Sequence, residues 1–275
     1  MSKDVVVVIG VGGMGQAIAR RTGSGRHLLL ADFNEATLHA AGDLLSGEGH
    51  HVTTRVVNIS DRDSVWALAE TAAGLGPVTH LAHTAGLSAA QASAEAILRV
   101  DLLGVALVLD AFTQVITPGG AAVVIASMAG HMVAGMPAEH ERALATAPAS
   151  DLSTLPFLTP DAVKDPGTAY TLAKRANVLR VQASAVAWGE RGARVNSISP
   201  GVISTPMAQQ ELAGENGEQM RAMVGASAAK RLGTPDDIAA AASFLLSSQA
   251  GFITGTDLLV DGGVIAALRT LTPVA

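Results

Sequence analysis

The sequence predicts an α/β protein in which helices cover both faces of a parallel sheet, and three observations carry this prediction. Seven short aliphatic runs alternate with longer, alanine-rich segments of helical periodicity. The runs are almost continuously apolar, which is the pattern of strands that are buried on both faces. A glycine-rich turn follows the first run directly, as is typical of doubly wound sheets. We therefore expect one domain with seven parallel strands over residues 1–275.

The expected strands are separated by segments that are long enough to form helices. In chain order they are Val5–Ile9, His27–Ala31, Val52–Val57, Val78–Ala82, Ala121–Ala126, Arg194–Ile198 and Thr256–Val260. Helices begin at capping residues, so the sequence also predicts two helix starts. One is Ser60, with Asp63 three residues on, and the other is Thr234, which Pro235 and Asp237 follow.

Two segments interrupt this alternation. Gly130–Gly167 contains five prolines and lacks one sustained periodicity, so we interpret it as an insertion that is either functional or mobile. Ser204–Arg231 is rich in Ala, Gln, Glu and Met and precedes the helix capped by Thr234. Both segments follow the carboxyl ends of strands, where doubly wound sheets bind ligands. We therefore expect Ser204–Arg231 to form a lid over a ligand.

Composition excludes several classes of protein. With 49% apolar and 15% charged residues, the chain can bury a sizeable core and is not disordered. A formal net charge of −6 without a basic patch argues against nucleic acid or a membrane surface as partner. The sequence has no cysteine, and its eight histidines show no paired spacing, so we expect no metal site. No apolar run has the length of a signal or membrane segment, and we expect a cytoplasmic enzyme.

A dinucleotide-binding motif follows the first expected strand. Residues 10–15, Gly-Val-Gly-Gly-Met-Gly, match G-x-G-x-x-G, in which glycines let a pyrophosphate approach the backbone at a helix N-terminus. Asp32 comes 22 residues after Gly10, at the end of the second strand. A carboxylate there can bind both hydroxyls of an adenosine ribose and would repel a 2′-phosphate, which predicts NAD. The alternative, in which the glycines only make a turn and Asp32 only caps a helix, explains this order of elements less well.

Three side chains are candidates for proton transfer and substrate binding. Tyr170 and Lys174 are four residues apart in an alanine-rich segment, so a helix places them on one face. A phenol exchanges its proton poorly near neutral pH unless a neighbouring ammonium group favours the phenolate. Ser127 follows the fifth strand, where its hydroxyl can hold a carbonyl oxygen. A Tyr-x-x-x-Lys pair can also be a simple surface contact, but the surrounding motifs favour the catalytic interpretation.

Taken in this order, the motifs resemble those of the short-chain dehydrogenase/reductase family over nearly the whole chain. Besides the residues above, the resemblance rests on Thr84-Ala85-Gly86, Arg194 to Gly201, Thr205 and Val260-Asp261-Gly262-Gly263. Within the family, the chain is most similar to the 3α-hydroxysteroid dehydrogenase/carbonyl reductase subgroup. This second similarity rests on Ala187 to Gly192, the insertion between Ser127 and Tyr170, and the tail Asp261 to Ala266.

The resemblance implies a role for each matching residue. Tyr170 would be the general acid/base, Lys174 would bind the nicotinamide ribose and favour the phenolate, and Ser127 would orient the substrate oxygen. The residues implied to contact the cofactor are Gly10, Gly12, Gly13, Met14, Gly15, Asp32, Asn58, Ile59, Ala85, Gly86, Tyr170, Lys174, Pro200, Gly201, Ile203 and Thr205.

The family resemblance also implies a homo-oligomer, a dimer or tetramer. It would pack through two long expected helices, Ala94–Ile116 and Ala169–Trp188. The insertion lies beside this surface and could obstruct it, so a dimer through another face is the alternative.

The chain departs from the family pattern at four places. Ile9 replaces a threonine before a glycine loop that is one residue shorter, Thr84 replaces an asparagine, and Asn58 replaces an aspartate. Asp101 stands where an asparagine holds a water-linked proton relay to the lysine. A carboxylate can accept the same bond, but its charge competes for Lys174. Asp101 is therefore a candidate relay residue.

These observations predict an NAD(H)-dependent oxidoreductase that interconverts a secondary alcohol and a ketone. The two interrupting segments offer Met, Leu, Val and Ala with few charges, which favours a bulky apolar substrate such as a hydroxysteroid or a cyclic or aromatic carbonyl compound. The alternative is a non-catalytic dinucleotide-binding sensor or scaffold of the same fold. A methyltransferase that binds adenosylmethionine at the glycine turn is disfavoured by the motif around Tyr170.

Overall fold

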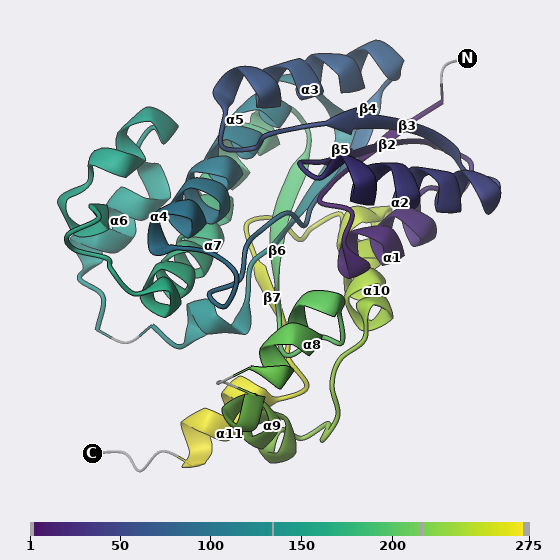
Figure 1. The fold of residues 1–275 in the computed structure, drawn as a ribbon. Coiled ribbons are helices and arrows are strands. Elements are labelled where there is room, and N and C mark those ends of the chain that lie inside the picture. The colour runs from purple at the N-terminus through teal and green to yellow at the C-terminus, as the bar shows by residue number, and fades with distance from the viewer. Residues whose placement is uncertain (1–2, 134, 215–216, 272–275) are drawn as a thin grey trace.

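Seven parallel strands form the centre of the molecule in the order β3-β2-β1-β4-β5-β6-β7 (Figure 1). The computed structural model describes residues 3–133, 135–214 and 217–271. The strands are β1 (Val5–Ile9), β2 (His27–Asp32), β3 (His51–Val56), β4 (Val78–His83), β5 (Ile116–Ile125), β6 (Arg194–Pro200) and β7 (Asp257–Val260). This confirms the predicted Rossmann-like, doubly wound sheet.

The register of the sheet brings separate sequence motifs to one edge. Ile9 lies opposite Ala31 of β2 on one side and opposite His83 of β4 on the other. The residues after these three strand positions therefore meet at the carboxyl edge of the sheet. The strand order reverses between β1 and β4, which is where doubly wound sheets form their ligand crevice.

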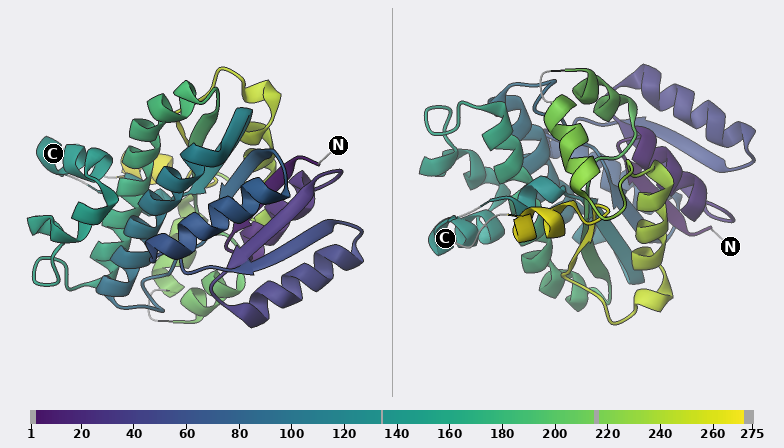
Figure 2. Two further views of the ribbon diagram at one scale, coloured as in Figure 1. Left: turned by 90° about the horizontal axis from the view of Figure 1, so that it is seen from above. Right: turned by 90° about the horizontal axis from the view of Figure 1, so that it is seen from below.

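Two layers of helices bury the two faces of the sheet, and both can be followed in Figure 2. One layer contains α1 (Gly13–Thr22), α2 (Glu35–Gly47) and α10 (Pro235–Leu246). The other contains α3 (Arg62–Leu75), α5 (Val105–Val115) and α7 (Pro166–Glu190). Successive side chains of β1 point alternately into the two cores, so every position of this strand is buried and apolar.

The structure corrects three expected element boundaries. The helix start predicted at Ser60 is wrong, because Asp61 caps α3 by accepting the Ser64 N–H at 3.3 Å. The helix expected at Ala94–Ile116 is instead α4 (Ala94–Ile97), a π-helical turn (Leu98–Gly104) and α5. Strand β5 begins at Ile116, five residues before its predicted start, because Pro118 and two glycines resemble a turn in the sequence.

Two other predicted helices agree more closely with the structure. The capping box of Thr234 and Asp237 is present at the start of α10, as predicted. Helix α7 contains the whole of the predicted Ala169–Trp188 and extends beyond it at both ends, because Asp165 caps it and Pro166 occupies its first position.

The segment 130–167 contains short helices rather than a continuous irregular loop. Its longest helix is α6 (Ala138–Thr146), which packs on α7 through the fully buried Leu144. Arg175 of α7 forms an ion pair with Glu141. Arg180 donates to the carbonyl oxygens of Leu144 and Ala147 at 2.9 and 3.0 Å. No sustained periodicity was visible in the sequence because each helical piece is nine residues or shorter.

The remaining helices gather at one end of the sheet. They are α8 (Pro206–Ala213), α9 (Gly217–Ala226) and α11 (Val264–Leu271), and they lie below the ends of β6 and β7 in Figure 1. Helices α8 and α9 belong to the segment Ser204–Arg231, so this segment has regular structure. None of the helices in the described ranges is both long enough and apolar enough to span a bilayer.

Candidate active site

The glycine turn leaves the N-terminus of α1 open. Gly10 has a φ of +89°, and a Cβ at this position would overlap the backbone of Ala85. Gly12 precedes the helix, and no side chain among the described residues caps it there. A Cβ on Gly12 would have no neighbour within 4 Å. An anion can therefore reach the free N–H groups of the first helical turn.

Asp32 is held against this turn. Its Oδ2 accepts the Val11 N–H at 2.8 Å, and its Oδ1 accepts the Asn34 N–H at 2.9 Å. Helix α2 is capped by Asn34, which accepts the Thr37 N–H at 2.9 Å, so the interpretation of Asp32 as a helix cap alone is wrong. The carboxylate is fixed beside the glycine turn, and each oxygen keeps a lone pair for a further donor.

Thr84 and two residues predicted to contact the cofactor, Asn58 and Ile59, stabilise the loops around the crevice. Thr84 donates its hydroxyl to the Gly10 carbonyl at 2.6 Å, so this departure from the family pattern ties β4 to the glycine turn. Asn58 accepts the N–H and the hydroxyl of Ser60 at 3.1 and 2.8 Å. Ile59 is buried, and a Cβ on Gly104 would lie 2.9 Å from its side chain.

Lys174 is the centre of a buried polar cluster. Its Nζ lies 3.0 Å from Oδ2 of Asp101, 3.5 Å from the carbonyl oxygen of Ile125 and 5.4 Å from the ring centroid of Tyr170. Lys174 and Asp101 are 5% and 0% exposed. The other oxygen of Asp101 accepts the Leu87 N–H at 2.7 Å. An ammonium group has three donors, and these two contacts use at most two of them, so at least one N–H of Lys174 remains for a ligand.

The surroundings determine the charge of this cluster. Burial acts to lower the pKa of Lys174, but the carboxylate of Asp101 and the side chain of Tyr170 outweigh it and raise the pKa above its ordinary value. Burial raises the pKa of Asp101, against the opposing effects of Lys174 and the Leu87 N–H. His83, at the end of β4, is kept neutral because burial first and Lys174 second lower its pKa to about 3.

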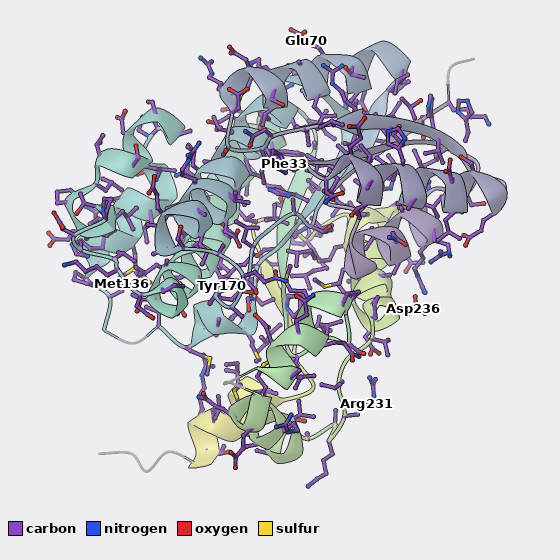
Figure 3. The ribbon with its side chains drawn as sticks, in the orientation of Figure 1. Phe33, Glu70, Met136, Tyr170, Arg231 and Asp236 are labelled. Carbon is purple, nitrogen blue, oxygen red and sulfur yellow. The ribbon has the colours of Figure 1, made fainter. Side chains whose placement is uncertain are left out.

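Ser127 lies on a short turn that packs against α7. It begins the 3-10 turn Met128–His131, and its Oγ accepts the Ala129 N–H at 3.2 Å. A Cβ on Gly130 would lie 2.9 Å from the backbone of Lys174, so only glycine allows this approach. The turn therefore fixes Ser127 relative to α7, the helix that carries Tyr170. Figure 3 labels Tyr170.

The segment after β6 meets the glycine turn from the other side. Pro200 ends the strand, and the Gly201 N–H donates to the Val260 carbonyl at 3.0 Å. Ile203 pairs with Gly233. Thr205 caps α8, and its methyl group would lie 3.2 Å from a Cβ on Gly13. The predicted contacts at both ends of a dinucleotide therefore border one crevice.

An apolar cluster covers this end of the sheet. Met128 after β5, Val202 after β6 and Val264 and Ile265 of α11 are buried together. The residues packed against them come from α9, the segment after it, β7 and α11, namely Met220, Met223, Val224, Leu232, Leu259 and Leu268. A cavity of about 180 Å³ borders the cluster and is lined in part by Gly201, Ile203 and Val264. Helix α11 was not predicted, although the spacing of its apolar residues is helical.

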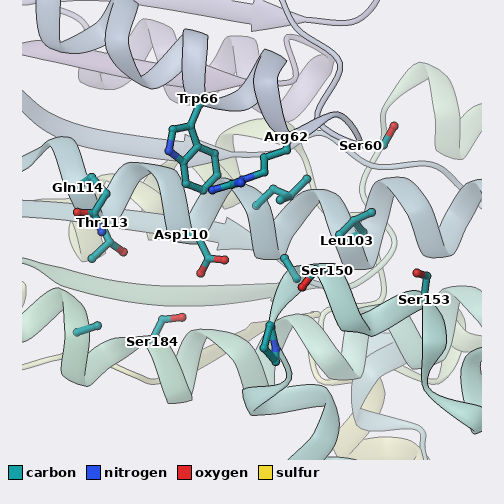
Figure 4. A pocket seen from close by; sticks show the side chains of 14 residues that line it. Ser60, Arg62, Trp66, Leu103, Asp110, Thr113, Gln114, Ser150, Ser153 and Ser184 are labelled. Atoms are coloured by element: carbon teal, nitrogen blue, oxygen red, sulfur yellow. The ribbon is translucent and has the colours of Figure 1, made fainter.

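A larger cavity of about 920 Å³ lies elsewhere, between α3, α5, α7 and residues 148–153 (Figure 4). Arg62 lies over the ring of Trp66 at 4.7 Å from its centroid, and Asp110, several serines and a few apolar residues are also part of the lining. None of the predicted catalytic residues borders this cavity. The predicted catalytic residues lie instead around Lys174, away from this cavity.

One aromatic residue at the crevice was not predicted. Phe33 directly follows Asp32, and 74% of its surface is exposed (Figure 3). An apolar ring in this place offers a stacking surface beside the carboxylate of Asp32. The sequence signal was an aromatic residue directly after the acid in a chain with only 3% aromatic residues.

Comparisons with known proteins agree with this architecture. Residues 3–138 match the family model described as short chain dehydrogenase, and residues 152–265 match the one described as enoyl-(acyl carrier protein) reductase. The short-chain dehydrogenase/reductase bsc3 of Alternaria brassicicola is 42% identical over 269 residues, which cover 98% of both chains. The NAD-dependent glycerol dehydrogenase of Listeria innocua is 40% identical over 99 residues, 36% of this chain and 38% of its own. The crystal structure of levodione reductase superposes with a TM-score of 0.76 at 26% identity, covering 96% of this chain and 98% of its own.

Proposed function

Because the chain belongs to the short-chain dehydrogenase/reductase family, we propose that it is an NAD(H)-dependent oxidoreductase that interconverts a secondary alcohol and a ketone. The observation that carries this proposal is the cluster around Lys174. A charged lysine lies beside Tyr170 at the edge of the crevice and keeps one donor for a ligand. This is the chemistry needed to exchange a proton with an alcohol oxygen.

The residues of the crevice fit a nicotinamide dinucleotide. The open N-terminus of α1 suits the pyrophosphate, and the free N–H of Lys174 suits the hydroxyls of the nicotinamide ribose. Asp32 suits the hydroxyls of the adenosine ribose and disfavours a 2′-phosphate, which is the basis for proposing NAD rather than NADP. The name of the Listeria innocua relative, an NAD-dependent dehydrogenase, supports the same choice.

In the proposed mechanism, the chain's own residues handle the proton and the substrate oxygen. When bound, the nicotinamide accepts or donates the hydride. During oxidation, Tyr170 takes the hydroxyl proton while the carbon loses a hydride, and during reduction it returns this proton to the new alkoxide. Lys174 stabilises the phenolate by its charge. Ser127 donates its hydroxyl to the substrate oxygen and keeps the reacting carbon in place.

We propose a bulky, largely apolar substrate, in line with the similarity to the hydroxysteroid dehydrogenase and carbonyl reductase subgroup. The support is the apolar cluster of Met128, α9 and α11 beside the crevice. Arg221 of α9 donates to the Leu212 carbonyl at 2.8 Å, so its guanidinium is held within the segment Ser204–Arg231. We infer that Ser204–Arg231 acts as the lid over this substrate.

We also propose a homo-oligomer in the cytoplasm. Residues 148–153 border α5 and α7, which favours the alternative interface expected if the insertion obstructs those helices. Edge strand β7 and its surroundings expose four apolar side chains, Val186, Phe244, Phe252 and Leu258, which suit a second copy. The cytoplasmic location rests on the lack of cysteine, which gives the chain none of the disulfides of oxidising compartments.

A spectrophotometric assay tests the enzymatic proposal. Secondary alcohols and ketones of increasing apolar area are incubated with NAD⁺ or NADH, and the absorbance of the reduced nicotinamide is followed. We expect hydroxysteroids or cyclic and aromatic carbonyl compounds to have a higher kcat/KM than small polar alcohols or hydroxy acids. A sugar or a hydroxy acid that wins by about tenfold, some 1.4 kcal/mol, would overturn the substrate class.

The second candidate function is a dinucleotide-binding sensor or scaffold without turnover. The observation that favours it is the ion pair of Lys174 with Asp101, which diverts part of the lysine charge from Tyr170. NADH binding without turnover of any substrate in the panel would support this candidate. Turnover that is lost in Tyr170→Phe would exclude it.

A further inference from the structure

A hydrogen-bonded chain links the turn after Ser127 to the edge of the sheet. Nε2 of His131, the last residue of the turn, lies 2.7 Å from Oδ2 of Asp257, the first residue of β7. The other carboxylate oxygen of Asp257 accepts the hydroxyls of Ser197 at 2.6 Å and Ser199 at 3.0 Å. Three side chains, one from the turn and two from β6, thus share the carboxylate of Asp257 in β7.

Asp257 is a rigid anchor. Its side chain is 6% exposed, and a carboxylate in such a position is stable only when hydrogen-bond donors surround it. Ser197 lies directly opposite Asp257 in the parallel pairing of β6 and β7. The anchor is therefore built into the sheet, and three donors hold the carboxylate in place.

The turn itself is held from two sides. On one side, Gly130 packs against the backbone of α7 at Lys174, and on the other, His131 reaches Asp257. Only three residues separate His131 from Ser127. A rotation of the turn about its contact with α7 would therefore move Ser127, and the bond between His131 and Asp257 prevents this rotation.

We propose that His131 and Asp257 are positioning residues that hold Ser127 at the substrate oxygen. This inference rests on the proposed function, in which Ser127 donates to that oxygen. His131 and Asp257 act through the backbone of the turn, so they affect the transition state and leave cofactor binding unchanged. Misplacement of a hydrogen-bonding group by about 1 Å can cost up to about 10² in rate.

The test measures kcat, KM and the Kd of NADH for His131→Ala and His131→Gln. We expect His131→Ala to lower kcat about tenfold with an unchanged Kd, and His131→Gln, which keeps a donor for Asp257, to recover most of this loss. His27→Ala is the matched control, because Nε2 of His27 also forms a partly buried hydrogen bond, to Thr53 at 2.8 Å, but in β2. This control should keep the wild-type kcat.

A double-mutant cycle separates positioning from a structural role. If His131 acts through Ser127, His131→Ala should have little further effect on kcat in a Ser127→Ala background. The inference would be overturned if His131→Ala lowered kcat by the same factor in both backgrounds, or if it left kcat unchanged. In either case an active wild-type enzyme would still support the proposed function. Wild-type protein without turnover would overturn both. Should His131→Ala not fold, as judged by thermal unfolding, His131→Asn replaces it, because its shorter side chain falls short of Asp257.

Discussion

Asp101 and Lys174 form a buried ion pair, with Oδ2 and Nζ 3.0 Å apart. Gly86 makes room for the pair, since a Cβ there would lie 3.0 Å from the carboxylate and 3.2 Å from the ammonium group. The family pattern has an asparagine at position 101, and a neutral amide cannot balance the lysine charge. In this chain, the carboxylate holds Lys174 protonated and at the same time weakens the positive potential that Lys174 exerts on Tyr170.

Asp101→Asn should therefore change the pH dependence of oxidation. Without the negative charge, Lys174 favours the phenolate of Tyr170 more strongly, so the rising limb of kcat/KM against pH should move to lower pH. The charged or titratable neighbours of Lys174 are Asp101, Tyr170 and the neutral His83. Asp110→Asn on α5 is the control for an equal change of net charge. An unchanged profile, or a shift to higher pH, would contradict this account.

Local patterns were sufficient to predict much of the fold and the placement of several candidate site residues at one edge of the sheet. The glycine turn, Asp32 and the Tyr170–Lys174 pair lie at short, fixed spacings in the chain, and strand and helix periodicities place them at one edge of the sheet. The ion pair of Asp101 with Lys174 could not be predicted from the sequence, because the π-helical turn that carries Asp101 replaces part of an expected regular helix.

Contacts between distant residues explain what the sequence could not show. His131 and Asp257 are 126 positions apart, and neither belongs to a motif. Helix α11 and the segment Ser204–Arg231 pack together through apolar residues that lie far apart in the chain. The start of α3 was misplaced by one residue because Ser60 and Asp61 are both good capping residues, and Ser60 instead bonds to Asn58.

The carboxylate of Asp32 should make the protein prefer NAD(H). NAD⁺ and NADP⁺ differ by the 2′-phosphate, which the anionic Asp32 would repel, so we expect NADH to bind at least about tenfold more tightly than NADPH. Fluorescence titration with both reduced cofactors measures the two Kd values. Asp32→Ala should narrow the difference, whereas Asp43→Ala on α2 should leave it unchanged. Equal or tighter binding of NADPH by the wild type would refute the assignment.

Tyr170 should be essential for turnover and dispensable for cofactor binding. Tyr170→Phe removes only the hydroxyl, so the Kd of NADH should stay near the wild-type value while kcat falls by a factor of about 10² or more. Lys174→Ala should weaken NADH binding and lower kcat, because the ammonium group stabilises the phenolate and has a donor free for the ribose. Full activity of Tyr170→Phe would show that another group transfers the proton.

The buried His83 should make the folded protein sensitive to acid. Its pKa of about 3 in the folded state lies below the ordinary value of 6.5, since burial and Lys174 disfavour the imidazolium. The folded chain therefore binds fewer protons, and stability that is present above pH 6.5 is lost as the pH falls toward 3. At pH 5 the loss from this one group is about 2 kcal/mol.

Urea unfolding at pH 7 and pH 5 measures this loss, and His83→Leu should reduce the difference in the free energy of unfolding between the two pH values. His39→Leu, on the exposed surface of α2, is the control. A wild type that is equally stable at both pH values would contradict the burial of a neutral imidazole beside Lys174.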